Sequence, residues 1–408
     1  MAVFIGIDWS STKHDVCVLN QDGTLVATLV LPHSADGLLK LETLRSQLGV
    51  VPSECLIGIE TAHSLVIDFL WARAYSQVYV IPPSVVKSTR PRYRQSGART
   101  DSSDAFLLAD LLRTDRSRLY PWHPDSLLTQ QIRNRVGLVT HLTRSAVRLS
   151  NRLYAVLTRY YPAALEVFSG LQTQIALRFL LSYPTPATAA ALTVEQFTSF
   201  ASEQHYPHPK KLPAAFARLQ QAHPLAEADT IAVYQNEMLQ LASLLLELVT
   251  AKSNQVRDLQ DLFAQHPDQA IFGSLPGAGE ILAPALLAHF GDDRERFPSA
   301  ASIQALAGTC PVTEQSGKRR TISFRTACDH HFRDIAQQWA KASLRHSVWA
   351  QAYWQQTRPH CQSESHAYRC LANRWLAIVW KLWQSHQAYD ETYHLQQRLQ
   401  RRQPRSSG

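Results

Sequence analysis

Four carboxylates in the first quarter of the chain have the residue types and spacing to do chemistry: Asp8, Glu60, Asp101 and Asp104. Crowded carboxylates repel one another, so a cluster of them in a cleft is costly unless a cation neutralises it. Hard oxygen ligands favour Mg²⁺ or Mn²⁺, whose coordination is completed by water and substrate phosphates. If the four converge, we predict an enzyme that cuts phosphodiester bonds with metal assistance. Taken singly, each acid is more often a strand cap or a solvated side chain.

The first two acids close short apolar runs. Asp8 follows Val3–Ile7 and Glu60 follows Leu56–Ile59, and both runs are β-branched and lack a helical period. Such runs predict buried strands. We therefore expect both carboxylates to stand at strand ends, where a side chain can leave the sheet for a cleft.

The other two acids lie in a segment with helical spacing of its apolar residues, Arg99–Leu112. A separation of three residues places Asp101 and Asp104 on one helix face. Thr100 is a candidate cap for that helix.

Strands and helices alternate through the first 115 residues, which predicts an α/β domain. We expect strands near 3–8, 14–19, 24–31, 55–60 and 78–82, and helices near 34–48, 63–75 and 101–113. Three leading strands, then strands alternating with helices, describe the mixed sheet of the RNase H superfamily. Gly6–Thr12 also resembles the first phosphate loop of sugar kinases and other actin-like ATPases, but the chain has only 15 Gly and lacks the further Gly-rich loops of that class. The kinase stays as an alternative.

A chain of 408 residues exceeds the size of one core, so several domains are expected. Pro121 and Pro124 mark a linker. Two long helices, near 125–161 and 227–265, form coiled-coil or bundle elements that serve either a dimer interface or packing within the chain. We expect a metal-binding domain at 1–118, a helical region at 119–266 with a Pro-interrupted insertion at 163–226, a helical domain at 267–390 and a disordered basic tail at 391–408.

Composition points to a polyanionic partner. The formal charge is +8 and, of 41 basic residues, 9 are Lys and 32 are Arg. Arg suits phosphates and stacks on bases, so nucleic acid is the first expectation, although a GC-rich genome produces the same bias. No stretch approaches the roughly 18–20 apolar residues of a membrane span. Six Cys without a paired framework predict reduced thiols in a cytoplasmic protein, and the Cys and His residues around 328–331 match no structural zinc spacing.

Two further segments suggest contact with nucleic acid. The first leads into the acidic pair and carries Lys87, Arg90, Arg92, Arg94 and Arg99, which we expect to contact phosphates unless the loop is merely solvated. The second, Leu275–Gly291, has a Pro-Gly-x-Gly turn that resembles a helix-hairpin-helix module, whose turn amides meet DNA phosphates. Tight helix packing would explain the same glycines.

Together these motifs resemble a known family. The order Gly-Ile-Asp at residue 8, Ile-Glu-Thr at residue 60, Arg-Thr-Asp-Ser-Ser-Asp-Ala at 99–105 and Leu-Pro-Gly-Ala-Gly at 275–279, then Ser-Gly with basic residues, is similar to that of the DEDD transposases of bacterial insertion sequences. These are the "IS one-ten" family of bridge-RNA-guided serine recombinases. The resemblance covers roughly 1–160 and 270–350. It implies an RNase-H/RuvC-like N-terminal domain, long coiled-coil-like helices and a mostly α-helical C-terminal domain.

The resemblance also implies a second active centre. The matching nucleophile is Ser316, which would form a phosphoserine beside Mg²⁺ held by the four acids. Lys318, Arg319, Arg320 and Arg325 would contact nucleic acid. The implied partners are double-stranded donor and target DNA, a structured non-coding guide RNA and further copies of the chain in a dimer or tetramer. The segment Ile322–Arg333 departs from the family pattern by lacking its usual Gly.

Two other functions stay open at this point. A RuvC-like structure-specific endonuclease would need the acids but not Ser316. A non-catalytic DNA- or RNA-binding protein would use only the basic helices.

Overall fold

The computed structural model of the chain describes residues 2–60, 65–92, 100–221, 226–317 and 319–402. The chain forms two compact units, Met1–Pro124 and Asp125–Gly408. The boundary falls in the Pro121–Pro124 segment where we expected a linker. Among the described residues, no helix is long and apolar enough to cross a bilayer.

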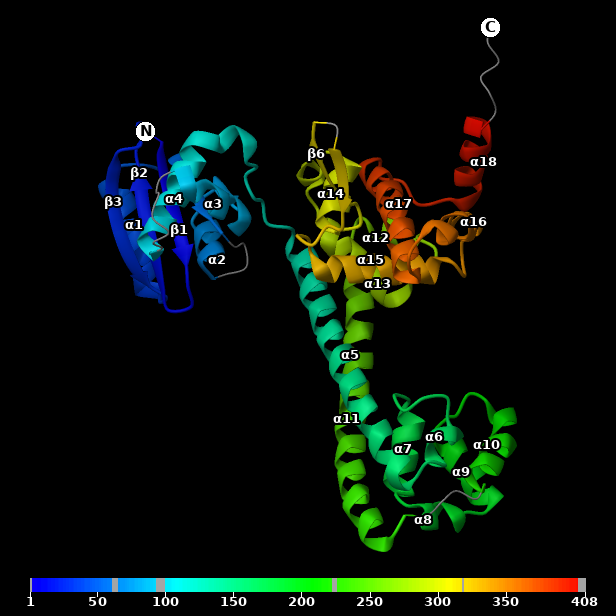
Figure 1. Cartoon of the computed structure of the whole chain (residues 1–408). Helices are drawn as coiled ribbons and strands as arrows, with labels where there is room; N and C mark the ends of the chain where they lie inside the picture. Colours follow the sequence, from blue (N-terminus) through cyan, green and yellow to red (C-terminus); the bar gives the residue numbers. More distant parts are fainter. Residues whose placement is uncertain (1, 61–64, 93–99, 222–225, 318, 403–408) are drawn as a thin grey trace. The chain divides into compact units, whose positions relative to one another are not determined.

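The first unit is built on a five-stranded mixed sheet in the order β3-β2-β1-β4-β5 (Figure 1). The strands β1 to β3 are antiparallel neighbours, whereas β4 and β5 run parallel to β1. Their bounds are β1 Val3–Trp9, β2 Lys13–Leu19, β3 Leu25–Pro32, β4 Cys55–Ile59 and β5 Val78–Val80. All five predicted strands are present.

Helices cover both faces of this sheet, because side chains along β1 alternate between two cores. Val3, Ile5 and Ile7 pack with apolar residues of α1 and α2, whereas Phe4 packs with those of α3 and α4. The bounds are α1 Ala35–Gln47, α2 Leu65–Ala72, α3 Pro83–Thr89 and α4 Asp101–Asp115, with short 3₁₀ turns at Pro52–Glu54, Arg90–Arg92 and Arg116–Arg118. Helix α3 was not among the predicted elements.

The second unit is mostly helical, so the expectation of an α/β N-terminal part followed by helices is confirmed. Its elements are α5 Leu127–Tyr160, α6 Ala164–Val167, α7 Gln174–Ser182, α8 Pro186–Ala190, α9 Val194–Glu203, α10 Leu212–Leu219, α11 Ala228–Ala264, α12 Gln269–Gly273, α13 Gly279–Phe290, α14 Ala300–Leu306, β6 Val312–Ser316, β7 Arg319–Ser323, α15 His330–Ser343, α16 Val348–Thr357, α17 Glu364–Gln384 and α18 Glu391–Arg402. The 3₁₀ turns are Pro209–Lys211, Arg294–Arg296 and Arg358–His360.

The long helices α5 and α11 lie side by side and antiparallel within the chain (Figure 1). Arg135 pairs with Asp258 at 3.0 Å, and further along α5 Arg152 pairs with Glu237 at 2.5 Å. One end of the pair packs in a core with α12 to α17, and the other end packs in a core with α6 to α10. Two arginines of α5 therefore form ion pairs with acids of α11.

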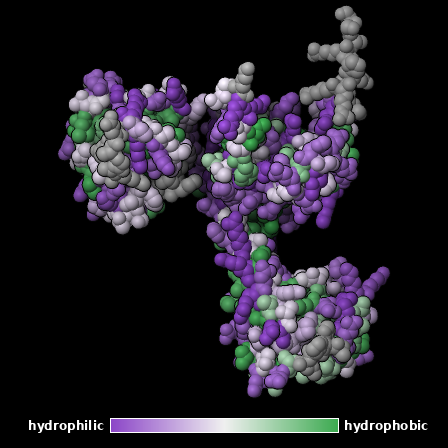
Figure 2. All heavy atoms as spheres, in the orientation of Figure 1, coloured by the Kyte–Doolittle hydropathy of each residue, from purple (hydrophilic) through white to green (hydrophobic). Residues whose placement is uncertain are grey.

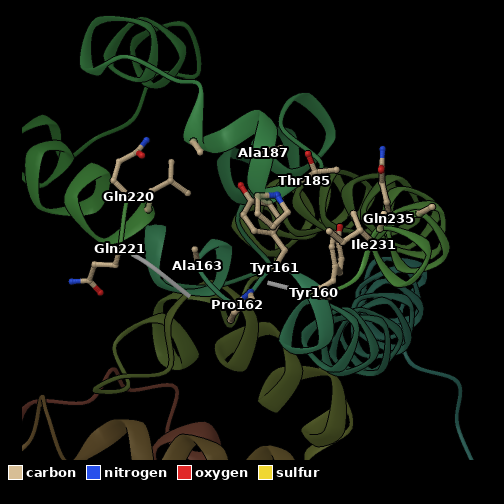
Figure 3. A pocket seen from close by; sticks show the side chains of 16 residues that line it. Tyr160, Tyr161, Pro162, Ala163, Thr185, Ala187, Gln220, Gln221, Ile231 and Gln235 are labelled. Carbon is tan, nitrogen blue, oxygen red and sulfur yellow. The ribbon is translucent and has the colours of Figure 1, made fainter. Parts of the chain in front are cut away.

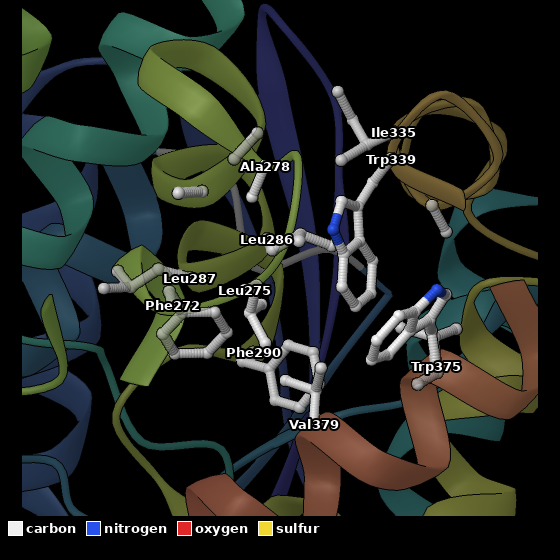
Figure 4. Close-up of a cluster of buried hydrophobic side chains, with 14 of the residues drawn as sticks. Phe272, Leu275, Ala278, Leu286, Leu287, Phe290, Ile335, Trp339, Trp375 and Val379 are labelled. Atoms are coloured by element: carbon white, nitrogen blue, oxygen red, sulfur yellow. The ribbon is translucent and has the colours of Figure 1, made fainter. Parts of the chain in front are cut away.

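The Pro-Gly-x-Gly turn between α12 and α13 lies in the larger of these cores (Figure 4). The Trp339 indole N–H of α15 donates to the Pro276 carbonyl at 3.1 Å. A Cβ placed on Gly277 would lie 2.8 Å from the Ala342 carbonyl oxygen, so α15 passes directly against this turn. Close helix packing accounts for Gly277, whereas a phosphate contact by this turn stays a prediction.

The prediction of a disordered tail over residues 391–408 is wrong for its first part, because Glu391–Arg402 form helix α18. The Glu391 carboxylate accepts hydrogen bonds from the Ser347 hydroxyl and from the backbone N–H of Trp349. Leu395 packs against the same core as α17. These contacts come from residues over forty positions earlier, so local polarity did not indicate them. Residues 403–408 lie outside the described residues.

Candidate metal-binding and nucleophile sites

Asp8 and Glu60 lie at the carboxyl ends of two neighbouring parallel strands, β1 and β4. The last matched pair of β1 and β4 is Ile7 with Ile59, and the two acids directly follow that pair. Both are half-buried. Because the carboxyl ends of parallel strands meet at one edge of a sheet, the two carboxylates leave the sheet at the same place.

Two glycines bring α4 directly onto this part of the sheet. A Cβ on Gly6 would lie 1.9 Å from the Ala105 carbonyl oxygen, and one on Gly58 would lie 3.0 Å from that of Leu108. Gly6 is two residues before Asp8 and Gly58 two before Glu60, so each glycine shares a sheet face with its acid. The acids therefore project on the side that α4 covers.

The start of α4 carries the other two acids to this region. Thr100 caps the helix by accepting from the Ser103 N–H at 3.2 Å, which leaves Asp101 as the first helical residue. Asp101 is exposed, whereas Asp104 is only 1% exposed. The Arg90 guanidinium donates to Asp104 at 2.8 Å and compensates its buried charge.

Lys13 and Asp15 complete the constellation, and the sequence analysis did not single them out. Asp15 of β2 is paired in register with Asp8 of β1, so their side chains share one face. The Lys13 ammonium lies 3.2 Å from a carboxylate oxygen of Asp15 and 3.2 Å from one of Asp101. Hydrogen bonds to Asp101 and Asp15 raise the pKa of Lys13. The alternation of Asp15 with apolar residues along β2 could have placed it on the face of Asp8.

The carboxylates share one face and end of the sheet but are spread apart. Within the described residues, no three of them bring their oxygens within 4.8 Å of one another. The carboxylates repel one another because they carry like charges. In addition, Asp101 is paired with the Lys13 ammonium and Asp104 with the Arg90 guanidinium. The donor set of four carboxylates suits a hard divalent ion, and side-chain rotation is the movement that its coordination would require.

The predicted phosphate-binding stretch is only partly visible, because Arg94 and Arg99 lie outside the described residues. Lys87 is exposed on α3. Arg90 pairs with Asp104, and its expected contact with phosphate stays a prediction. Arg92 is exposed, and its guanidinium lies 3.6 Å from Asp115. Among the described residues of this basic stretch, Lys87 and Arg92 are thus the two whose charged groups are exposed to solvent.

Ser316 ends the first strand of an exposed two-stranded hairpin, β6–β7. It is paired with Arg319, and Arg320 of β7 is paired with Gln315. Gly317 follows with a φ of +56°, a left-handed conformation that glycine adopts without strain. Ser316, Arg319 and Arg320 are all exposed, whereas Lys318 lies outside the described residues. The hairpin therefore presents a hydroxyl and two guanidiniums together.

The base of the hairpin is fixed to the helical core by aromatic and polar contacts. The guanidinium carbons of Arg333 and Arg369 lie 4.5 and 4.6 Å from the centre of the Phe324 ring. Arg325 donates to the Cys310 carbonyl at 3.4 Å. Arg325, predicted to bind nucleic acid, is thus partly engaged within the protein. In the part of the chain that the structure describes, no hydrogen bond reaches the Ser316 hydroxyl.

The Cys, Asp and His residues around position 328, whose spacing matches no structural zinc site, contact other parts of the protein. Cys328 contacts the Arg333 guanidinium, and His289 pairs with Asp329 at 3.3 Å. Asp329 also caps α15 by accepting from the Phe332 N–H at 2.9 Å. This set serves packing and helix capping.

A cavity of about 640 Å³ opens in the smaller helical core, among α5, α8, α10 and α11 (Figure 3). Tyr160, Tyr161, Thr185 and Ile231 are among its walls. The described residues around it include no carboxylate, imidazole, thiol or cationic side chain. Its described walls therefore carry no charged side chain.

Comparisons with known proteins match both parts of the chain that carry these residues. A family model described as "Transposase" matches residues 5–162, and another, "Transposase IS116/IS110/IS902 family", matches 269–355. The first match spans all four acids and the second spans Ser316. The "Mini-circle putative transposase for IS117" of Streptomyces coelicolor is 30% identical over 96% of both chains. The "Insertion element IS900 uncharacterized 42 kDa protein" of Mycobacterium paratuberculosis is 24% identical over 95% of this chain and 97% of its own.

Proposed function

This chain belongs to the IS116/IS110/IS902 family of transposases and is a DNA transposase, and we propose that it cuts and rejoins DNA through a phosphoserine on Ser316. Mg²⁺, or Mn²⁺ in its place, would be held by Asp8, Glu60, Asp101 and Asp104. The observation that carries this proposal is the position of the acids at the ends of β1, β4 and α4 on one face of the sheet.

We assign the first unit to the RNase-H/RuvC-like fold from its strand order. Three antiparallel strands come first in the sequence, and parallel strands separated by helices follow at the other side of β1. Asp8 and Glu60 then occupy the carboxyl ends of the central strand β1 and of its parallel neighbour β4.

In the proposed reaction the Ser316 oxygen attacks phosphorus and the bond from phosphorus to the 3′-oxygen breaks. The products are a 5′-phosphoserine and a DNA 3′-hydroxyl, which takes up the proton lost by the serine. Arg319 and Arg320 would offset charge on the transferring phosphoryl group, since they lie exposed beside the serine. Bound Mg²⁺ supplies positive charge that stabilises the attacking and leaving oxygens. Reversal of the attack by another 3′-hydroxyl rejoins the strands.

Donor and target DNA would be chosen by base pairing to a structured non-coding RNA. The net charge of +8 and the excess of Arg over Lys support a protein that holds nucleic acid by its backbone. Among the described residues, we propose that nucleic acid contacts Lys87 and Arg92 of the first unit and Arg319 and Arg320 of the second. All four side chains are exposed.

We also propose that the active protein is a dimer or tetramer. Figure 2 shows hydrophobic side chains among the hydrophilic ones along α5 and α11. Six large apolar residues of these helices are more than two-fifths exposed: Leu127, Leu138, Val147, Tyr154, Val233 and Leu244. Contact with a second copy would remove this surface from water. A serine from one copy could then meet the acids of another.

The direct test is formation of a protein-DNA adduct. Purified protein is incubated with the non-coding RNA that flanks its gene, end-labelled donor and target DNA and Mg²⁺, and adducts are separated on denaturing gels. Ser316→Ala should abolish the adduct, and Asp8→Asn, Glu60→Gln or Asp104→Asn should abolish strand cleavage. Ser323→Ala is the matched control, because Ser323 is an exposed serine on the same hairpin, opposite Val312.

A structure-specific endonuclease without a serine nucleophile is the second candidate function. The four acids alone would support an endonuclease. Among the described residues no hydrogen bond reaches the Ser316 hydroxyl, and an endonuclease of this kind does not need that hydroxyl. It predicts that Ser316→Ala still cuts DNA and that no variant forms an adduct. Cleavage that survives all three acid substitutions would contradict both functions. Omission of the RNA tests guidance separately, because an unguided transposase would select the same target without it.

A further inference from the structure

Three side chains with metal-ligand atoms meet at the start of α17. The ligand atoms of Cys361, His366 and Cys370 all lie within 4.8 Å of one another. His366 and Cys370 are four residues apart on α17, which places them on one helix face. Cys361 comes from the short segment that precedes the helix. All three residues are half-buried.

The backbone around these side chains is already held in place. Ser363 caps α17 by accepting from the His366 N–H at 3.2 Å. The Arg358 guanidinium donates to the Cys361 carbonyl at 3.3 Å and fixes the preceding segment. Less conformational entropy is therefore lost when a ligand joins the segment to the helix.

The ligand types and spacing suit a thiophilic metal. Thiolate sulfur and imidazole nitrogen are the ligands that select zinc over magnesium or calcium. With Zn–S bonds of about 2.3 Å, the edge of a tetrahedral site is roughly 3.8 Å. The three ligand atoms would need to approach one another by at most about 1 Å, which rotation of the half-buried side chains provides.

The electrostatics are consistent with uptake of a cation in exchange for protons. Burial raises the pKa of the Cys370 thiol, and Cys361 raises it further, whereas Arg369 and Arg374 oppose this shift. A divalent metal with two thiolates carries no net charge, so its binding would add none among the neighbouring arginines.

We propose that Cys361, His366 and Cys370 bind one zinc ion, with water as the fourth ligand. Binding breaks two S–H bonds, forms two Zn–S bonds and one Zn–N bond, and releases two protons to solvent. The ion ties the segment before α17 to the first two turns of that helix. Because Leu371 and Trp375 of α17 lie fully inside the core, the site stabilises the domain that carries Ser316. The proposal does not depend on the recombination mechanism.

The test uses the full chain purified under reducing conditions without chelator. We expect about one zinc per chain by mass spectrometry, and exchange with Co²⁺ should give a thiolate-to-cobalt charge-transfer band with the visible bands of tetrahedral cobalt. Hard carboxylate sites give no such charge-transfer band, so metal at the acids is distinguished. Zinc should also raise the melting temperature relative to chelator-treated protein.

Cys361→Ser and Cys370→Ser should each remove the band and weaken zinc binding by more than the roughly 10–100-fold lost with an outer-shell partner. Cys310→Ser is the control, because Cys310 is a half-buried cysteine outside the group and should bind zinc as before. Cys361 lies outside the helices, so its variant keeps the fold, which circular dichroism verifies. Absence of zinc and of the cobalt band in the reduced wild-type protein would overturn the proposal, as would an unchanged band in Cys361→Ser.

Discussion

Lys13 and Asp101 join the start of strand β2 to the first residue of helix α4, with 3.2 Å between the ammonium nitrogen and a carboxylate oxygen. The same nitrogen lies 3.2 Å from a carboxylate oxygen of Asp15, whose strand partner is Asp8. A cationic side chain therefore already occupies the side of the acid cluster where we propose a metal ion. Because the Lys13 ion pair engages Asp101, we expect Lys13 to compete with the proposed metal ion for this carboxylate.

We expect Lys13→Met to raise the affinity of the DNA-free protein for divalent metal several-fold, because Asp101 is released from its ion pair. Titration with Mn²⁺, followed by electron paramagnetic resonance, measures the affinity. Lys40→Met is the matched control, since Lys40 is an exposed lysine on α1. An affinity in Lys13→Met equal to or below that of the control would contradict competition between Lys13 and the metal.

Gly6→Ala should lower the free energy of unfolding of the first unit by at least about 2 kcal/mol. The added Cβ would lie 1.9 Å from the Ala105 carbonyl oxygen, so α4 must move off the sheet together with Asp104. Urea denaturation measures the change. Gly137→Ala in α5 is the control, because its Cβ meets nothing within 4 Å and should stabilise the helix by about 0.5–1 kcal/mol. Equal stability of Gly6→Ala and wild type would mean that α4 does not pack on Gly6.

The two glycines of the turn before α13 should differ in their tolerance of alanine. Both have a positive φ, +73° for Gly277 and +56° for Gly279. At Gly277 the Cβ would also overlap the backbone of α15, so Gly277→Ala should cost about 2–4 kcal/mol, whereas Gly279→Ala should cost about 1–2 kcal/mol. Denaturant unfolding ranks the two, and the opposite order would refute the packing role of Gly277.

Asp329 should make stability depend on pH in the acid range. Burial alone raises the pKa of its carboxyl, but the hydrogen bonds from His289 and the Phe332 N–H, with the nearby imidazoles, bring the pKa down to about 2. The unfolded value is about 3.9, so this contribution is complete above about pH 4 and is lost as pH falls to about 2.

Asp329→Asn keeps a helix-capping side chain but removes the charge. We expect it to be less stable than wild type at pH 7, and the difference should shrink between pH 4 and pH 2. Denaturant unfolding at a series of pH values measures it. The exposed Asp22→Asn should match wild type at every pH, and a constant gap for Asp329→Asn would exclude the charge as its cause.

Much of the architecture could be predicted from short-range pattern. The five strands of the sheet and the helices α1, α2 and α4 begin and end within a few residues of the expected positions, and α5 and α11 do so as well. Apolar periodicity and turn residues act over neighbouring positions, so the sequence displays them directly. The same locality explains one error, since the polar segment from Glu391 becomes helical only through contact with Ser347 and Trp349.

By itself the sequence therefore determined the five strands of the sheet, most helices of the first unit and the two long helices, and it placed Asp8, Glu60, Asp101 and Asp104 at the ends of such elements. Ser316 was found only through family resemblance, because a serine before glycine is an ordinary turn residue. Tertiary structure decided the partners: Lys13 with Asp101, Arg90 with Asp104, and Cys361 with Cys370. Such contacts depend on how closely whole elements approach, as α4 does over Gly6, and that approach is set by packing between segments far apart in the chain.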